Sequence, residues 1–247
     1  MSFYSKTAAS RRALMLLALL GAAAGQALAD EAAIRKALAE RMPSLPKIDE
    51  ISKTPVPGLY EVRMGNDLVY ADENGDYLFD GSLFETRSRT DLTKARVDKL
   101  TAIDFATLPF KDALVMKQGN GSRRLAVFAD PNCGYCKRLE RDLVALKDVT
   151  IYTFMIPILG PDSNVKARDI VCAKDSMKVW RSWMIDGTTP PKAGEKCDSA
   201  VLDRNLELGR KHKVNGTPAL VFEDGTRAPG ALPADRIEKL LAGARKS

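Results

Sequence analysis

Two cysteines with two residues between them, in the segment Cys133-Gly134-Tyr135-Cys136, are the residues of this chain best suited to chemistry. An apolar run over 125–129 precedes them and a helical pattern over 137–146 follows, which predicts a strand and then a helix that begins at the cysteines. Unpaired N–H groups and the positive end of the helix dipole favour the thiolate form of Cys133 there. Because a thiolate attacks disulfides, the segment predicts thiol–disulfide exchange.

The same spacing could serve two other purposes. Structural zinc takes four ligands, usually as two close pairs, but the remaining candidates Cys172, Cys197 and the single histidine, His212, form no second close pair. An inert disulfide between neighbouring cysteines closes too small a loop to add much stability. We therefore favour a redox-active pair, and we expect no metal and no organic cofactor.

Residues 1–29 have the features of a secretory signal. Lys6, Arg11 and Arg12 form a positive start, an apolar stretch over 13–25 follows, and Ala27-Leu28-Ala29 is an A-x-A cleavage site. The apolar stretch is shorter than the roughly 20 residues that span a membrane, which disfavours an anchor. We expect export, cleavage and a soluble mature chain.

The charge balance indicates no special partner. The full chain has 38 Lys+Arg against 32 Asp+Glu, and three of the positive charges lie in residues 1–29. Basic residues form no block interleaved with aromatic residues, which speaks against nucleic-acid binding. The 218 residues that remain after cleavage are enough for one large domain or two smaller ones.

Cys172 and Cys197 are 25 positions apart and belong to no motif. Exported proteins fold in an oxidising compartment, and pairing Cys133 with Cys136 leaves these two for each other. We predict a structural disulfide rather than a second redox pair. His212 lies between Lys211 and Lys213, and we interpret it as a surface or capping histidine rather than a catalytic base.

Two patterns predict two folding units. A helix over 31–41 is followed by short strand-like runs and turns over 48–86, which indicates a small antiparallel sheet without reactive residues. Its exposed edges would invite pairing with a second copy. The helical spacing over 90–105 predicts a linker helix, with a core helix of the second unit as the alternative.

The rest of the chain alternates strands and helices, as an α/β domain does. We expect strands over 113–116, 125–129, 150–158 and 219–222, a helical insertion within 163–213, and helices over 200–211 and 233–244. Gly216-Thr217-Pro218 comes just before the last strand, and its proline suits either a strand edge or a cis peptide bond.

The CxxC segment and the later proline loop together resemble the thioredoxin superfamily. More closely, residues 128–136 (FADPNCGYC) and 216–219 (GTPA) resemble the active-site segments of the DsbC/DsbG family of periplasmic disulfide isomerases. Gly134 favours the DsbC branch, because DsbG-type proteins have proline there. Lys137 departs from the family, whose DsbC members often have histidine at this position.

The resemblance implies an α+β protein of two domains. Residues 30–90 would form a cystatin-like dimerisation domain of one helix and an antiparallel sheet, and residues 91–109 a helical linker. Residues 110–247 would form a thioredoxin-like catalytic domain with a helical insertion. It also implies that the Thr217–Pro218 bond is cis.

The resemblance further implies an isomerase of the periplasm. Cys133 would be the exposed nucleophile and Cys136 the shielded resolving thiol, with Gly134, Tyr135, Thr217 and Pro218 binding the substrate. The partners would be wrongly disulfide-bonded exported proteins, a membrane reductase of the DsbD type and a second copy of the chain. A thiol reductase or oxidase of the same fold, or a DsbG-like holdase chaperone with secondary thiol activity, are the alternatives.

Overall fold

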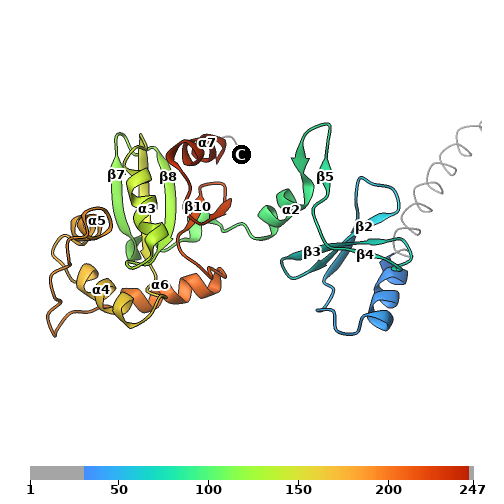
Figure 1. Ribbon diagram of the computed structural model, residues 1–247, viewed down its shortest axis with the longest axis horizontal. Helices are drawn as coiled ribbons and strands as arrows, with labels where there is room; N and C mark the ends of the chain where they lie inside the picture. The colour runs from blue at the N-terminus through green and yellow to red at the C-terminus, as the bar shows by residue number, and fades with distance from the viewer. Residues whose placement is uncertain (1–30, 245–247) are drawn as a thin grey trace, which may run out of the picture. The chain divides into compact units, whose positions relative to one another are not determined.

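The computed structural model describes residues 31–244, which divide into two compact units between Leu100 and Thr101 (Figure 1). The predicted secretory signal, residues 1–29, lies outside the described residues. Among the helices that the structure describes, none has both the length and the apolar character needed to cross a membrane.

The N-terminal unit packs one helix on an antiparallel sheet. The helix occupies residues 31–41, and the sheet has the strand order β1-β2-β3-β4. Alternate side chains of β2 point into the core, as expected for a sheet with one face covered. Ile34 and Leu38 of the helix pack there against Val62 of β2. The strands are β1 (Glu50–Lys53), β2 (Leu59–Met64), β3 (Asp67–Asp72) and β4 (Leu78–Phe79).

The helix α2 (Leu92–Leu100) is shorter than the helix predicted over 90–105. It follows a two-stranded ribbon, β5 (Phe84–Glu85) and β6 (Thr90–Asp91), and contacts the N-terminal sheet. Arg96 forms ion pairs with Glu50 and Glu61, and no side chain of α2 is buried. The helix ends at Leu100, and Ile103 is buried in the second unit, where its N–H donates to the Gly225 carbonyl at 3.1 Å.

The C-terminal unit is built on a five-stranded sheet of order β11-β10-β8-β9-β7, in which only β8 and β9 pair in parallel. Parallel neighbours need a long crossover, and here the crossover contains the helix α3 (Gly134–Leu143). The strands are β7 (Leu114–Gln118), β8 (Arg123–Ala129), β9 (Val149–Met155), β10 (Ala219–Phe222) and β11 (Arg227–Pro229).

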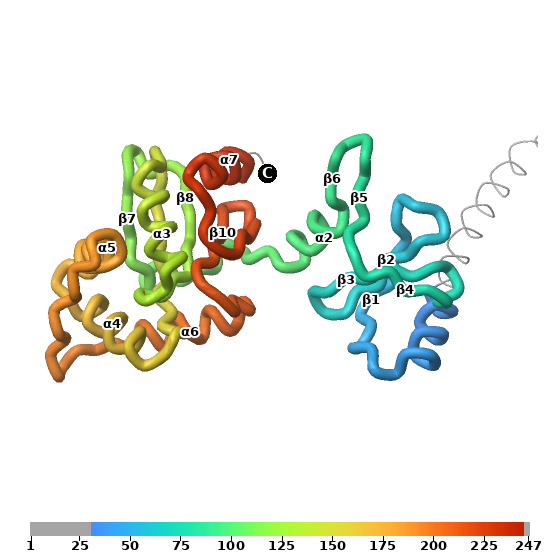
Figure 2. Tube along the Cα trace, in the orientation of Figure 1, coloured from blue at the N-terminus to red at the C-terminus, as the bar shows by residue number. Residues whose placement is uncertain are grey.

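Helices cover both faces of this sheet, so its central strands are buried on both sides. Leu125 and Val127 of β8 face the layer that contains α3 and the final helix α7 (Ala234–Ala244), while Ala126 and Phe128 face the opposite layer. That opposite layer includes α6 (Ala200–Lys211) and the short helices η1 (Phe105–Thr107) and η2 (Phe110–Asp112). In Figure 2, α3 runs in the same direction as the drawn strands β7 and β8, and α6 lies at the lower end of the unit.

The predicted helical insertion is present between β9 and β10. It contains α4 (Pro161–Val171), α5 (Ser176–Arg181), a π-helical turn η3 (Ser182–Asp186) and α6. A disulfide joins Cys172, which follows α4, to Cys197, which precedes α6. The bridge therefore closes a loop of the chain that contains α5 and η3.

Candidate active site

Cys133 is the N-cap of α3, immediately after the strand β8. Its Sγ accepts a hydrogen bond from the Cys136 N–H at 3.4 Å, and its carbonyl accepts from the Lys137 N–H at 3.0 Å. The sulfur thus takes the place that a serine or aspartate oxygen has at an ordinary helix start. The predicted position of the CxxC pair at the N-terminal end of a helix is confirmed.

Both cysteines of the pair are free thiols, and both are buried. Cys133 is 5% exposed and Cys136 is 1% exposed, so the expectation that Cys133 is openly exposed is wrong in this form of the protein. The cause is the loop at Thr217, which covers the sulfur. Tyr135, between the two cysteines, is 67% exposed instead, and Gly134 is also exposed.

Thr217 and Pro218 lie beside Cys133, as the resemblance implies. The Thr217–Pro218 peptide bond is cis, and the Cys133 thiol donates a hydrogen bond to the Thr217 carbonyl at 3.2 Å. The sheet explains this contact, because β10 begins at Ala219 and pairs with β8, with Ala219 opposite Phe128. The segments before β10 and after β8 therefore meet at one end of the sheet.

Burial raises the pKa of the Cys136 thiol far above its ordinary value. The Asp130 N–H, the second-largest influence, lowers this pKa, whereas the neighbouring Cys133 raises it. The side chain of Thr217 lowers it slightly. Cys136 is therefore held as a neutral thiol, which suits a group that does not attack an incoming disulfide first.

Asp130 is a residue of the site that the sequence analysis did not single out. Its carboxylate is fully buried and accepts four hydrogen bonds. The donors are Asn132 N–H (2.7 Å), Ile158 N–H (2.7 Å), Leu159 N–H (3.0 Å) and the Ser163 hydroxyl (2.8 Å). Three of these donors are 28 to 33 positions later in the chain, so no local pattern reveals them.

Glu140 is a second buried acid that the sequence analysis missed. It lies in α3 one turn after Cys136, is 3% exposed, and accepts a hydrogen bond from Trp180 Nε1 at 2.8 Å. Burial raises its pKa, while the Trp180 hydrogen bond and the charge of Arg181 partly oppose that rise. A helical pattern alone would place this glutamate on the solvent side.

His212 lies outside the dithiol site. It is the C-cap of α6, where its N–H donates to the Leu208 carbonyl at 3.1 Å, in agreement with the predicted capping role. Burial, Lys211 and Arg227 lower its pKa. Within residues 31–244, no group of three or more His, Cys, Asp and Glu side chains is arranged to hold a metal ion.

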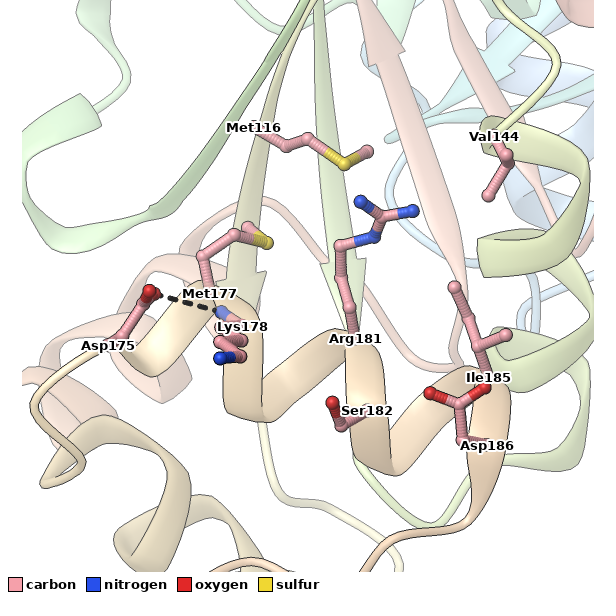
Figure 3. Close-up of a pocket in the computed structure, with 9 residues that line it drawn as sticks. All are labelled: Met116, Val144, Asp175, Met177, Lys178, Arg181, Ser182, Ile185 and Asp186. Carbon is pink, nitrogen blue, oxygen red and sulfur yellow. Dashed lines mark hydrogen bonds between the residues drawn. The ribbon is translucent and has the colours of Figure 1, made fainter.

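Two pockets lie at different parts of the C-terminal unit. One of about 590 Å³ lies between β7, the end of α3 and α5, and Figure 3 shows Arg181 extending into it toward Met116. None of the predicted site residues lines it. Another of about 320 Å³ is lined by the loop 213–219, which includes Pro218 and Thr217, the residue whose carbonyl accepts the Cys133 hydrogen bond.

Comparison with known proteins assigns both units. Residues 110–245 match the thioredoxin-like domain family, and residues 25–94 match the N-terminal domain of disulfide bond isomerase proteins. A probable thiol:disulfide interchange protein DsbC of Bordetella pertussis is 45% identical over 209 residues, covering 85% of this chain and 73% of the relative.

More distant relatives agree with this assignment. The thiol:disulfide interchange protein DsbC of Escherichia coli is 28% identical over 238 residues, covering 94% of this chain and 95% of the relative. A crystal structure of a disulfide interchange protein from Neisseria gonorrhoeae superposes with a TM-score of 0.52 at 37% identity, covering 56% of this chain and 99% of that one. With both domains matched and the cysteine pair in place, this chain belongs to the DsbC family of thiol:disulfide interchange proteins.

Proposed function

We propose that this protein is a thiol:disulfide isomerase that rearranges non-native disulfides in exported proteins of the periplasm. The observation that carries the proposal is the arrangement of the two thiols. Cys133 caps the helix next to the Thr217 carbonyl, and Cys136 is buried one turn behind it with a raised pKa. This asymmetry separates an attacking thiol from a resolving thiol.

The reaction begins with the Cys133 thiolate. It attacks one sulfur of a wrong client disulfide, forms a mixed disulfide and releases the other client sulfur as a thiolate. A different client thiol can then attack the mixed disulfide, which forms a new client disulfide and regenerates the Cys133 thiolate. That cycle rearranges bonds without a net change of oxidation state.

If no client thiol attacks the mixed disulfide, the mixed disulfide is resolved in a second way. Cys136 attacks the Cys133 sulfur, forms the Cys133–Cys136 disulfide and releases the client with both of its thiols reduced. The protein then needs two electrons and two protons before it can act again. We propose a membrane reductase of the DsbD type as the donor.

The client chain would bind along the Thr217 loop. When Cys133 loses its proton, its hydrogen bond to the Thr217 carbonyl is lost, and that carbonyl becomes available to a client N–H. The pocket along residues 213–219 adjoins this position, and the exposed Tyr135 ring offers an apolar contact next to the attacking sulfur. Gly134, Tyr135, Thr217 and Pro218 would thus contact substrate.

We further propose that the protein is a homodimer joined through residues 30–90. β4 is an edge strand; Tyr77 and Phe79 at this strand, and Phe84 in β5, are exposed large apolar side chains in the single chain. An unpaired strand edge with apolar side chains is a surface that a second copy can cover. Two joined copies would present two Cys133 sites to one client.

A second activity, holding unfolded chains, is favoured by the loop before α4. Ile158 and Leu159 are exposed apolar residues, although their N–H groups are bound to the buried Asp130 carboxylate, three residues before Cys133. The loop that exposes these apolar side chains is thus joined by hydrogen bonds to the segment that precedes the attacking thiol. Suppressed aggregation of a client without cysteines would demonstrate such an activity.

Refolding of a scrambled multi-disulfide enzyme tests the main proposal. Sub-stoichiometric protein in a glutathione buffer should restore the client's activity, and Cys133→Ser should not, because the attacking sulfur is gone. If the wild-type protein forms disulfides in a fully reduced client but leaves the scrambled client inactive, the protein is an oxidase and the isomerase proposal is wrong.

A further inference from the structure

Three consecutive residues just before Cys133 are bound by residues of the helical insertion and of the loop that leads into it. Asp130 is bound by donors at and just before the start of α4. The Pro131 carbonyl accepts a hydrogen bond from Trp183 Nε1 at 2.6 Å, and Asn132 Nδ2 donates to Asp162 Oδ2 at 2.7 Å. The chain segment that leads into Cys133 is therefore held by residues that come well after it in the sequence.

Trp183 makes a second contact, with the residue that follows the cysteine pair. Lys137 Nζ lies 3.9 Å from the centroid of the Trp183 ring, and Lys166 Nζ lies 5.3 Å from it. Both distances are within the roughly 6 Å over which an ammonium is attracted to an aromatic face. Trp183 thus touches the backbone before Cys133 and the charge after Cys136.

The position of Trp183 follows from the local helix. Trp180 and Trp183 are three residues apart and lie on neighbouring positions of one helical surface, which packs against α3. Trp180 Nε1 binds Glu140 inside α3, and Trp183 Nε1 binds the loop that leads into α3. Trp183 lies in the π-helical turn η3, a geometry that recurs at functional sites.

We propose that Trp183 is a positioning residue that sets the redox equilibrium of the Cys133–Cys136 pair, by holding the Pro131 carbonyl and by keeping the Lys137 ammonium beside the N-terminal end of α3. The inference rests on the proposed dithiol chemistry of that pair. Trp183 acts on the sulfurs through its contacts with Pro131 and Lys137, which lie on either side of the two cysteines.

The direction of the effect follows from the state that the structure describes. Both cysteines are free thiols there, and Trp183 makes its contacts with Pro131 and Lys137 in that state. A positive charge at the helix start also stabilises a thiolate, which exists only in the reduced protein. Loss of Trp183 should therefore destabilise the dithiol form and shift the equilibrium toward the disulfide.

Equilibration with glutathione measures this shift. The reaction converts one protein disulfide and two glutathione molecules into one protein dithiol and one glutathione disulfide. Trp183→Leu removes both contacts and should favour the protein disulfide by about two- to tenfold, the range expected for one hydrogen bond. Trp183→Phe keeps an aromatic ring but loses the Nε1–H donor, and it should shift the equilibrium by a smaller factor. Lys178→Met removes an exposed lysine of α5 and serves as the matched control, with the wild-type equilibrium.

A double-mutant cycle with Lys137→Met tests the coupling. Because Lys137 and Trp183 share a contact, the change in the double variant should be smaller than the product of the two single changes. Cooperative urea unfolding shows which variants are folded. If Trp183→Leu does not fold, the same cycle with Trp183→Phe and Lys137→Met tests whether the two residues are coupled.

The outcomes separate the two proposals. A wild-type protein that does not exchange with glutathione overturns the dithiol function, and the role of Trp183 with it. Two results would overturn the role of Trp183 alone, provided that the wild-type protein exchanges with glutathione. In the first, the folded Trp183 variants have the wild-type equilibrium constant. In the second, the effects of the Trp183 and Lys137 substitutions on that constant multiply independently in the double variant.

Discussion

The Cys133 thiol donates its hydrogen bond to the carbonyl of Thr217, 84 positions later in the chain, at 3.2 Å. The same contact that places the sulfur also covers it, which leaves Cys133 only 5% exposed. Deprotonation removes the donor and so removes this bond. Activation of the nucleophile and release of the neighbouring carbonyl are thus one event.

The roles of the two thiols can be separated by trapping. Cys136→Ser should accumulate mixed disulfides between Cys133 and client proteins, because the resolving sulfur is absent. Cys133→Ser should accumulate few or none, since the remaining thiol is buried and has a raised pKa. Non-reducing gels measure both results, and the opposite pattern would reverse the assignment.

The Cys172–Cys197 disulfide should support stability and not chemistry. Replacing both cysteines by alanine should lower the free energy of unfolding by about 3.5 kcal/mol, according to the chain-entropy estimate for a loop of this length. Urea unfolding measures the loss, and exchange with glutathione should stay at the wild-type equilibrium. A folded variant that no longer exchanges would show that this pair takes part in the reaction.

Glu140 should make stability depend on pH. Burial raises its pKa above the ordinary 4.5, so at a pH between the ordinary and the raised pKa the folded protein holds a proton that the unfolded chain has lost. The free energy of unfolding therefore falls as the pH rises from 4.5 through the pKa of the folded protein. The slope of this fall is about 1.4 kcal/mol per pH unit while only the unfolded chain is ionised.

Glu140→Gln should lack this fall, because glutamine does not titrate and can still accept the Trp180 hydrogen bond. Urea unfolding at a series of pH values should show a stability difference between variant and wild type that grows in favour of glutamine as the pH rises. The exposed Glu195→Gln provides the control. Parallel curves for Glu140→Gln and wild type would contradict the prediction.

Dimer formation should depend on the edge strand β4. Phe79→Lys places a charge on a 54%-exposed apolar position of that edge and should give a monomer in light scattering. The monomer should still reduce small disulfides but should refold scrambled clients poorly. Val115→Lys, at a 47%-exposed position of the edge strand β7 in the other unit, is the matched control. A wild-type monomer, or a Phe79→Lys dimer, would be evidence against this interface.

Local patterns predicted most of the secondary structure. The strand β10 and the helix α6 have the predicted bounds, because apolar spacing and turn residues mark both of their ends. Strand β9 ends at Met155 and not at residue 158. Pro157 has no N–H for the sheet, and the Ile158 N–H binds the Asp130 carboxylate. The short β11 was missed because its three residues include an arginine and a proline.

The site was predictable where its residues belong to a short motif, and not where a residue's role depends on a partner elsewhere in the chain. The CxxC spacing and the proline loop are visible in the sequence, and Cys133, Cys136, Thr217 and Pro218 remain the predicted reacting and binding residues. Asp130, Glu140 and Trp183 were missed because their partners are distant in the sequence or come from another helix. Such contacts depend on the packing of the insertion against α3.

The distance along the chain between Cys133 and its cover has a consequence for biosynthesis. A polypeptide is made from its N-terminus, and β10 with the preceding Thr217 loop comes late in this chain. Until the Thr217 loop has been synthesised, it cannot cover the Cys133 thiol. By then the nascent chain also contains Cys136, Cys172 and Cys197. A protein built to correct mispaired cysteines must therefore first avoid mispairing its own.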